Sequence, residues 1–196
     1  MMKNILSLLV LINFLISSLS FAQDKYLIED KQSQIEGFVK YAGVGKYIAQ
    51  FKSFEGEVIF DPKNRQIESV LLKIKTKSLK SKRPRLDKFV LSKRLLDANQ
   101  FPEIIFKSKI IEKTKDAYYV TGNVNMHGIT QKISFSFTLE EVKEKDGSKI
   151  LKAKGRWILN RKYFKVIWNT ILDKGGIIVD DHIIVDWNLI AVPSAS

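Results

Sequence analysis

The 196-residue chain contains no cysteine and only two histidines, His127 and His182. Without cysteine, disulfides, thiolate metal sites and cysteine nucleophiles are all excluded. The histidines lie far apart in sequence, and neither has a second ligand beside it at metal-binding spacing, so a histidine-rich metal centre is not expected. The sequence also has no G-x-S-x-G motif and no obvious pair of carboxylates. It therefore predicts neither an enzyme nor a cofactor.

Acidic residues are outnumbered, because 21 Asp and Glu stand against 33 Lys and Arg, which gives a formal net charge of +12. The positive charge is concentrated between residues 73 and 93, where Asp87 is the only acid. This basic segment comprises Lys73, Lys75, Lys77, Lys80, Lys82, Arg83, Arg85, Lys88 and Lys93. It either keeps the surface solvated or docks on an anionic membrane. Nucleic acid is not an expected partner, because the aromatic residues alternate into apolar faces instead of interleaving with the lysines.

A long apolar run occurs only at the N-terminus. Met1-Met2-Lys3 is a basic start, the apolar run extends over the 17 residues from Ile5 to Phe21, and Ser20-Phe21-Ala22 ends it with small residues. This layout predicts a signal peptide at residues 1–22, cleaved after Ala22, and a periplasmic or secreted protein. An uncleaved anchor is the alternative, for which the run is short, since a spanning helix needs about 20 apolar residues. Residues 23–196 are expected to form one domain.

The whole chain has 45% hydrophobic and 28% charged residues, which is enough to bury a core. Apolar and polar residues alternate with a period of two in eight runs. The runs are residues 35–41, 54–60, 72–76, 104–110, 118–126, 133–139, 151–157 and 183–189. Each run has one apolar face, and closing the sheet encloses these faces and removes the sheet edges. The sequence therefore predicts a mainly β protein, an eight-stranded antiparallel β-barrel, with Phe38 as an apolar exception on a polar face.

Two segments depart from the period of two. Residues 84–99 and 160–170 carry apolar residues nearer to helical spacing, and Pro84 lies at the start of the first segment. We expect both to be short helical insertions that pack on the barrel or plug it. Asn160 is placed to cap the second insertion, and Arg161 either anchors it to a carboxylate or faces the polar end of a ligand.

Several segments of the chain resemble, in the same order, the motifs of a known protein family. Thr121 to Lys132, with His127-Gly128 at its centre, resembles the "G-x-L-t-i-H-G-v-T-k" signature of the YceI-like polyisoprenoid-binding family of exported bacterial proteins. Further segments are similar to other motifs of the family, namely residues 51–61, 76–79, 95–108, 159–164 and 175–181. The chain departs from the family pattern at Tyr41 and at Phe89, where many members have histidine.

The resemblance implies a lipocalin-like barrel that holds a long isoprenoid chain, such as a quinone tail or a polyprenyl lipid, for carriage or storage. The candidate ligand-binding residues are Phe60, Ile74, Phe89, Phe106, Met126, His127, Phe135, Phe137, Trp157, Arg161, Trp168 and Trp187. Ordinary core packing is the alternative for each apolar residue. His127 either contacts a head group or is a turn histidine held by backbone. An interaction module with an anionic partner, a hydrolase and a homodimer also stay open.

Overall fold

The computed structural model describes residues 24–41, 45–168 and 179–194, which form eleven strands, one α-helix and two 3-10 turns. The predicted signal peptide, with its cleavage site at Ala22, lies outside the described residues. The strands are β1 (Asp24–Ile28), β2 (Gln34–Tyr41), β3 (Gly45–Phe51), β4 (Phe54–Asp61), β5 (Gln66–Lys75), β6 (Leu79–Ser81), β7 (Glu103–Lys113), β8 (Tyr118–Met126), β9 (Ile129–Lys143), β10 (Lys149–Asn160) and β11 (His182–Pro193). The helix is α2 (Pro84–Leu91), and the 3-10 turns are η1 (Thr76–Ser78) and η2 (Arg161–Phe164). No helix among these residues is long and apolar enough to cross a membrane.

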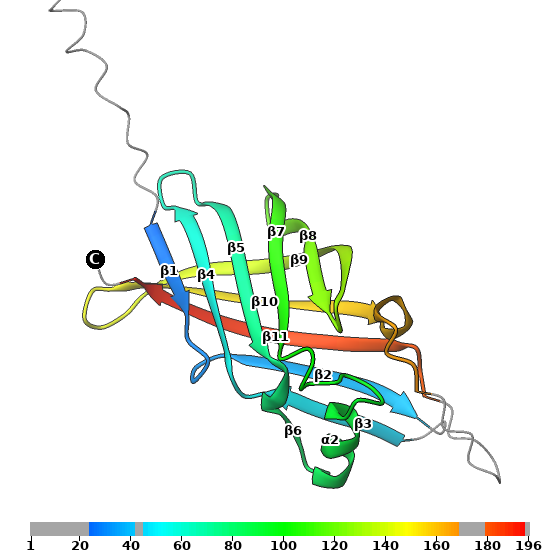
Figure 1. The fold of residues 1–196 in the computed structure, drawn as a ribbon. Helices are drawn as coiled ribbons and strands as arrows, with labels where there is room; N and C mark the ends of the chain where they lie inside the picture. The colour runs from blue at the N-terminus through cyan, green and yellow to red at the C-terminus, as the bar shows by residue number, and fades with distance from the viewer. Residues whose placement is uncertain (1–23, 42–44, 169–178, 195–196) are drawn as a thin grey trace, which may run out of the picture.

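The strands form one antiparallel sheet that closes into a barrel (Figure 1). Neighbours follow the order β1-β4-β5-β7-β8-β9-β10-β11, and β1 pairs with β11 to close the ring. The strands β2, β3 and β6 extend this ring, since β2 pairs with β11, β3 with β2 and β6 with β3. The predicted eight-stranded antiparallel barrel is therefore confirmed.

Eleven strands make an eight-stranded barrel because three of the barrel strands are each broken in two. β1 and β2 pair with successive stretches of β11, β3 and β4 continue one another across Lys52 and Ser53, and β5 continues through η1 into β6. Ser33 spans the first break, because its hydroxyl accepts from the Ile190 backbone N–H at 2.8 Å. The breaks let the long strands bend without leaving the sheet.

Each of the eight predicted runs lies in a different strand of the barrel. The sequence analysis missed β1, β3 and β6, which are the other halves of the three broken strands. In β1 and β3 the outward residues Leu27 and Ile48 are apolar and exposed, so the alternation of apolar and polar residues is interrupted there. β6 has only three residues, too few to show a period.

Both predicted helical insertions are shorter than expected. The helix predicted over residues 84–99 ends at Leu91, where Ser92 adopts an extended backbone and its hydroxyl donates to the Phe89 carbonyl at 2.7 Å. The segment predicted over 160–170 contains a single 3-10 turn, η2, and residues 169 and 170 lie outside the described part of the chain. The expected cap is confirmed, because the Asn160 side chain accepts from the Lys162 backbone N–H at 3.0 Å.

The core consists of two clusters at opposite ends of the barrel. The first cluster is centred on Phe60 and Ile67 and includes residues of β1 and β4. The second cluster includes Leu95 and Leu96, which follow α2, and Phe164 of η2. Residues of both clusters also line the interior cavities, for example Ile67 of the first cluster and Leu96 of the second.

Candidate functional site

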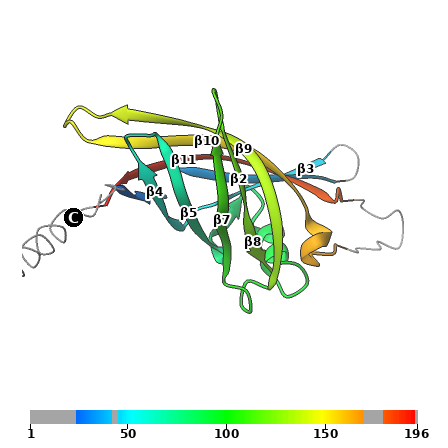
Figure 2. The same ribbon diagram turned by 90° about the horizontal axis from the view of Figure 1, so that it is seen from above.

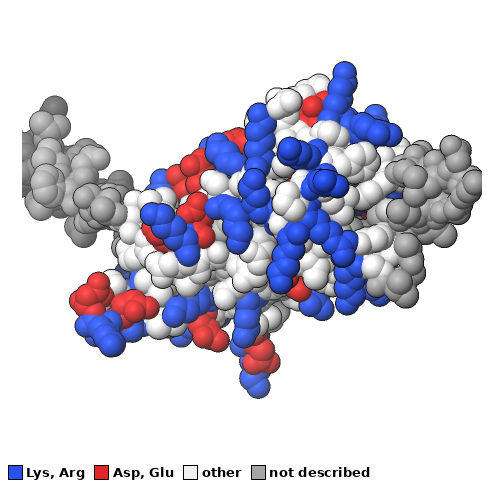
Figure 3. All heavy atoms as spheres, turned by 90° about the horizontal axis from the view of Figure 1, so that it is seen from below, with Lys and Arg blue, Asp and Glu red and all other residues white. Residues whose placement is uncertain are grey.

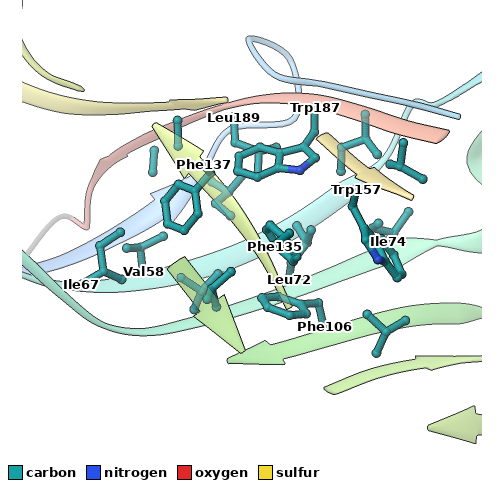
Figure 4. Close-up of a pocket in the computed structure, with 18 of the residues that line it drawn as sticks. Val58, Ile67, Leu72, Ile74, Phe106, Phe135, Phe137, Trp157, Trp187 and Leu189 are labelled. Atoms are coloured by element: carbon teal, nitrogen blue, oxygen red, sulfur yellow. The ribbon is translucent and has the colours of Figure 1, made fainter. Parts of the chain in front are cut away.

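The barrel interior contains two apolar cavities. The first has a volume of about 130 Å³ and every residue that lines it is apolar (Figure 4). Its walls come from β1, β2, β4, β5, β7, β8, β9, β10 and β11, with Val58, Leu72, Phe106, Phe137 and Trp187 among the lining residues. Such a wall offers no fixed hydrogen-bond partner, so its contacts with a guest are hydrophobic.

The second cavity, of about 150 Å³, lies toward α2 and η2. Val90 of α2 and the following Leu95 and Leu96 line it, so the helical insertion covers this end of the interior. Unlike the first cavity, it has polar side chains in its wall, among them Tyr47 and Arg161.

The two cavities share part of their walls. The shared residues are Ile35, Ile74, Ile104, Val124, Trp157 and Val185. Trp157 of β10 points across the interior toward Ile74 of β5 (Figure 4). The indole ring of Trp157 therefore stands at the boundary between the cavities, and a long guest has to pass it.

An aromatic cluster surrounds the first cavity, with Phe135 at its centre. The Phe135 ring centroid lies 5.7 Å from that of Phe106, 6.5 Å from that of Trp157 and 6.0 Å from that of Trp187. Gly155 lies opposite Trp187, and a Cβ there would come within 2.6 Å of the indole. The glycine therefore makes room for Trp187 inside the barrel.

Nine of the twelve candidate residues line a cavity. Phe106, Phe135, Phe137 and Trp187 line the first cavity, Met126, Arg161 and Trp168 line the second, and Ile74 and Trp157 line both. The alternation of residues was sufficient to predict the positions in the strands, because it separates inward from outward side chains, whereas Arg161 and Trp168 lie outside the alternating runs. The same alternation could also have predicted Val185, which faces inward two residues before Trp187.

Phe60 and Phe89 do not line either cavity, which corrects their expected place in the wall, and His127, a candidate for contact with a head group, lines neither cavity. Phe60 is fully buried and packs edge-on against Tyr26, with ring centroids 6.1 Å apart, so it fills the first cluster. Phe89 of α2 packs against Trp168, with ring centroids 5.1 Å apart. Both side chains support the walls from behind.

His127 is a turn histidine. It lies with Gly128 in the β8–β9 hairpin, and both residues have positive φ, 53° and 73°, as a two-residue hairpin turn requires. Its Nδ1 lies 3.0 Å from the Phe164 carbonyl oxygen, and its ring packs edge-on against Phe101. Of the two interpretations of His127, the structure supports the one in which backbone holds the ring, and His127 ties η2 to the hairpin.

Arg161 is buried and makes four hydrogen bonds through its guanidinium. It donates to the carbonyl oxygens of Val166, Val179 and Asp180 at 2.8, 3.2 and 3.0 Å, and to the Asp181 carboxylate at 2.9 Å. The predicted carboxylate anchor is therefore confirmed. Arg161 is also among the residues that line the second cavity, while the hydrogen bonds of its guanidinium hold the backbone around η2 together.

Asp87 of α2 is a buried anchor that the sequence analysis did not single out. Its carboxylate accepts from the Tyr47 hydroxyl at 2.7 Å, from the Ser81 backbone N–H at 2.9 Å and from the Ser81 hydroxyl. Burial by itself raises the pKa of Asp87, but the hydrogen bonds from Ser81 and Tyr47 together outweigh burial and lower it. Burial and the bond to Asp87 raise the pKa of Tyr47. Asp87 thus fastens α2 to β3 and β6 beside the second cavity.

Metal-binding clusters are absent from the part of the chain that the structure describes. No three His, Asp or Glu side chains gather there as metal ligands. His182 is exposed, with its Nδ1 3.4 Å from the Asp180 carboxylate, and lies outside both cavities. The two cavities of the described interior are lined mainly by apolar side chains.

Comparison with known proteins gives both a family and relatives. Residues 26–191 match the profile of a family described as the YceI-like domain. A UPF0312 protein of Yersinia enterocolitica is 31% identical over 113 residues, which are 56% of this chain and 59% of the relative. A UPF0312 protein of Yersinia pestis matches at the same identity and coverage. The matched part of the chain therefore spans about three fifths of the length of these curated relatives.

Solved structures share the fold. BcnA of Burkholderia cenocepacia superposes with a TM-score of 0.73 at 23% identity, covering 84% of this chain and 99% of BcnA. A polyisoprenoid binding domain from Saccharophagus degradans, implicated in plant cell wall breakdown, superposes with a TM-score of 0.66 at 9% identity. The match covers 86% of this chain and 98% of that domain. The YCEI protein of Campylobacter jejuni superposes with a TM-score of 0.61 at 18% identity. The match covers 76% of this chain and 85% of the Campylobacter protein. At these identities the likeness shows a common architecture.

Proposed function

Because this chain belongs to the family of YceI-like domains, we propose that it is a binding protein that holds the hydrocarbon chain of an isoprenoid lipid inside its barrel. The observation that carries the proposal is the pair of adjoining cavities, of which the first is lined entirely by apolar residues. The structural neighbour described as a polyisoprenoid binding domain supports the same ligand class. A quinone tail and a polyprenyl lipid both present this chemistry.

The size and lining of the cavities agree with a long, thin guest. Each cavity is smaller than the roughly 300 Å³ at the lower end of ligand pockets, so a guest of useful length occupies both and passes Trp157. Each buried CH₂ group contributes about 0.8 kcal/mol, so a prenyl chain needs no strong polar contact to bind. We propose that the head group lies toward the second cavity, whose wall includes Tyr47 and Arg161.

The site chemistry favours binding over catalysis. The His127 ring is held by backbone, and the Arg161 guanidinium is used in structural hydrogen bonds. We further propose that the protein is exported on the predicted signal peptide and carries or stores its lipid in the periplasm or outside the cell. Mass spectrometry of the protein from the envelope fraction tests export, since a chain that still carries residues 1–22 would contradict it.

The ligand is tested by extraction. We expect organic solvent to release a long-chain isoprenoid from the purified protein, and the emptied protein to bind a polyprenol or a long-tailed quinone. Mass spectrometry identifies the extracted lipid, and displacement of a fluorescent prenyl probe measures binding. If no isoprenoid is extracted and neither compound displaces the probe, the proposed function is wrong.

A second candidate function, docking on an anionic membrane, is favoured by the unpaired charges of the basic segment. Lys73 and Lys75 pair with Glu55 and Glu103. Within the described ranges, the exposed side chains of the segment without an ion pair are Lys77, Lys80, Lys82, Arg83, Arg85, Lys88 and Lys93. Figure 3 shows basic side chains gathered over the face that is seen from below. Near an anionic membrane each such charge contributes about 1 kcal/mol.

Replacing Lys82, Arg85 and Lys88 with glutamate is expected to weaken binding to phosphatidylglycerol vesicles at least about 10-fold, because charge attraction becomes repulsion. Co-sedimentation measures the binding, and phosphatidylcholine vesicles provide the uncharged reference. The matched control replaces the exposed Lys109, Lys115 and Lys145, which lie outside the segment, with glutamate, so the net charge changes by the same amount. Equal losses in the two variants would mean that only the net charge of the protein matters and would exclude a specific docking surface.

A further inference from the structure

The barrel wall is open between β9 and β10. These strands pair from Lys143↔Lys149 as far as Phe137↔Gly155. Beyond that point, the described residues 129–136 of β9 pair only with β8, and residues 156–160 of β10 pair only with β11. Figure 2 shows β9 curving away from β10 over this stretch.

A groove of about 660 Å³ occupies the opening on the outer surface. Phe135 and Trp157 line this groove and also line the interior cavities. Their rings are stacked, with centroids 6.5 Å apart and an interplanar angle of 28°. At this place a single layer of side chains separates the outside from the interior, and no strand pairing has to break for those side chains to move.

The opening has a defined boundary at its far end. η2 connects the end of β10 back to β9, because the Gln131 side chain donates to the Tyr163 carbonyl at 3.0 Å. His127 contacts the next carbonyl, that of Phe164. The opening is therefore a window, closed by paired strands at one end and by η2 at the other.

The outside of the window is also apolar. Ile158 and Tyr163, which line the groove, are 55% and 66% exposed. Ile158 ends a row of outward apolar residues that lie opposite one another on adjacent strands, Ile158, Ile184, Phe38 and Ile48. Phe38, the exception to the alternation in the sequence, belongs to this row. A hydrocarbon chain that leaves the window thus finds an apolar surface outside it.

Unlike the window, both ends of the barrel are blocked by buried side chains. Phe60, Tyr26 and Tyr118 are buried at the end that holds the first cluster. At the other end, α2 and the following Leu95 and Leu96 cover the second cavity, and Asp87 fastens α2 in place. Passage through either end requires buried side chains to leave their packing.

We propose that the hydrocarbon chain enters and leaves the barrel sideways, between β9 and β10, by displacing Phe135 and Trp157. The proposal rests on the proposed function, since it assumes a guest with an apolar chain. It assigns Phe135 and Trp157 the role of a gate, in addition to lining the cavities.

A cross-link across the window tests the proposal, and the absence of cysteine makes the test specific. Continuing the β9–β10 register places the exposed Ser134 opposite Ile158. The variant Ser134→Cys/Ile158→Cys is joined with a reducible bis-maleimide, and the uptake and release of a fluorescent prenyl probe are timed. We expect both rates to fall at least 10-fold and to recover on reduction. The matched control, Thr138→Cys/Lys154→Cys, bridges a pair that is already in register and should keep its rates.

The outcomes distinguish a failure of the proposed window from a failure of the proposed lipid binding. Unchanged rates in the cross-linked variant, with normal rates in the control, would show that the chain takes another path and would overturn the window. If the unmodified protein does not bind the probe, the proposed function itself fails. A second pair, Lys132→Cys/Asn160→Cys, lies in the same groove and replaces the first if that variant does not fold.

Discussion

Replacement of Val185 by tryptophan is expected to lower the affinity for a prenyl probe at least about 100-fold, a loss of about 2.7 kcal/mol. Val185 lines both cavities and lies directly opposite Trp157 of β10 and Gly37 of β2. An indole at this position fills the space where the cavities adjoin. A long guest can then occupy at most one of two small spaces.

The barrel should survive the substitution, because the added side chain enters existing space and overpacking costs typically about 1–3 kcal/mol. Circular dichroism and thermal unfolding verify the fold, and probe titration measures the affinity. The control Asn188→Trp adds the same side chain three residues further along β11, at an exposed position. If Val185→Trp folds and binds as tightly as the control, the guest does not occupy the space between the cavities.

Replacement of Arg161 by methionine is expected to reduce the free energy of unfolding by about 3–5 kcal/mol, because a buried charged donor is lost while its acceptors remain. Methionine keeps much of the apolar stem but donates no hydrogen bond. The carbonyl oxygens of Val166, Val179 and Asp180 all lose a donor. Urea denaturation followed by tryptophan fluorescence measures the change.

Lys162→Met provides the matched control, because Lys162 pairs with the same carboxylate, Asp181, at 2.6 Å but from the surface. The hydrogen bond from Lys162 is the main cause that lowers the pKa of Asp181. An exposed pair contributes about 0–1 kcal/mol, so the control should unfold almost as the parent does. Equal destabilisation by the two substitutions would show that the charge of Asp181, and not the backbone bonds of Arg161, sets the stability here.

The barrel could be predicted from the sequence because its determinants are local. Alternation within five to ten residues separates the inward Phe135, Phe137 and Trp187 from their outward neighbours, and all three line the first cavity. The pattern fails at Phe38 and Ile48, where outward residues are apolar. These residues belong to the row outside the window, so the failure of the pattern coincides with a surface feature.

The parts that could not be predicted depend on contacts between distant segments. Asp87 reads as an ordinary acid in a basic segment until the fold brings Tyr47 and Ser81 to it. Phe60 satisfies the same alternation as Phe106, but only the packing against Tyr26 shows that it fills the core instead of lining a cavity. The ligand class came from the family resemblance and not from the residue pattern, because apolar faces describe a core as well as a container.

The closure of the ring by β1 and β11 has a consequence for how the protein folds. The closing pairs, such as Tyr26↔Pro193, join positions near the two ends of the sequence. Contacts of such long range are slow to form, because the whole intervening chain loses entropy before they stabilise anything. The consecutive hairpins from β7 to β10 can form early, while the polypeptide is still being synthesised. The barrel cannot close around its apolar interior until β11 is available to pair. Until then the apolar side chains that line the cavities are exposed, and exposed apolar surface of this kind favours aggregation.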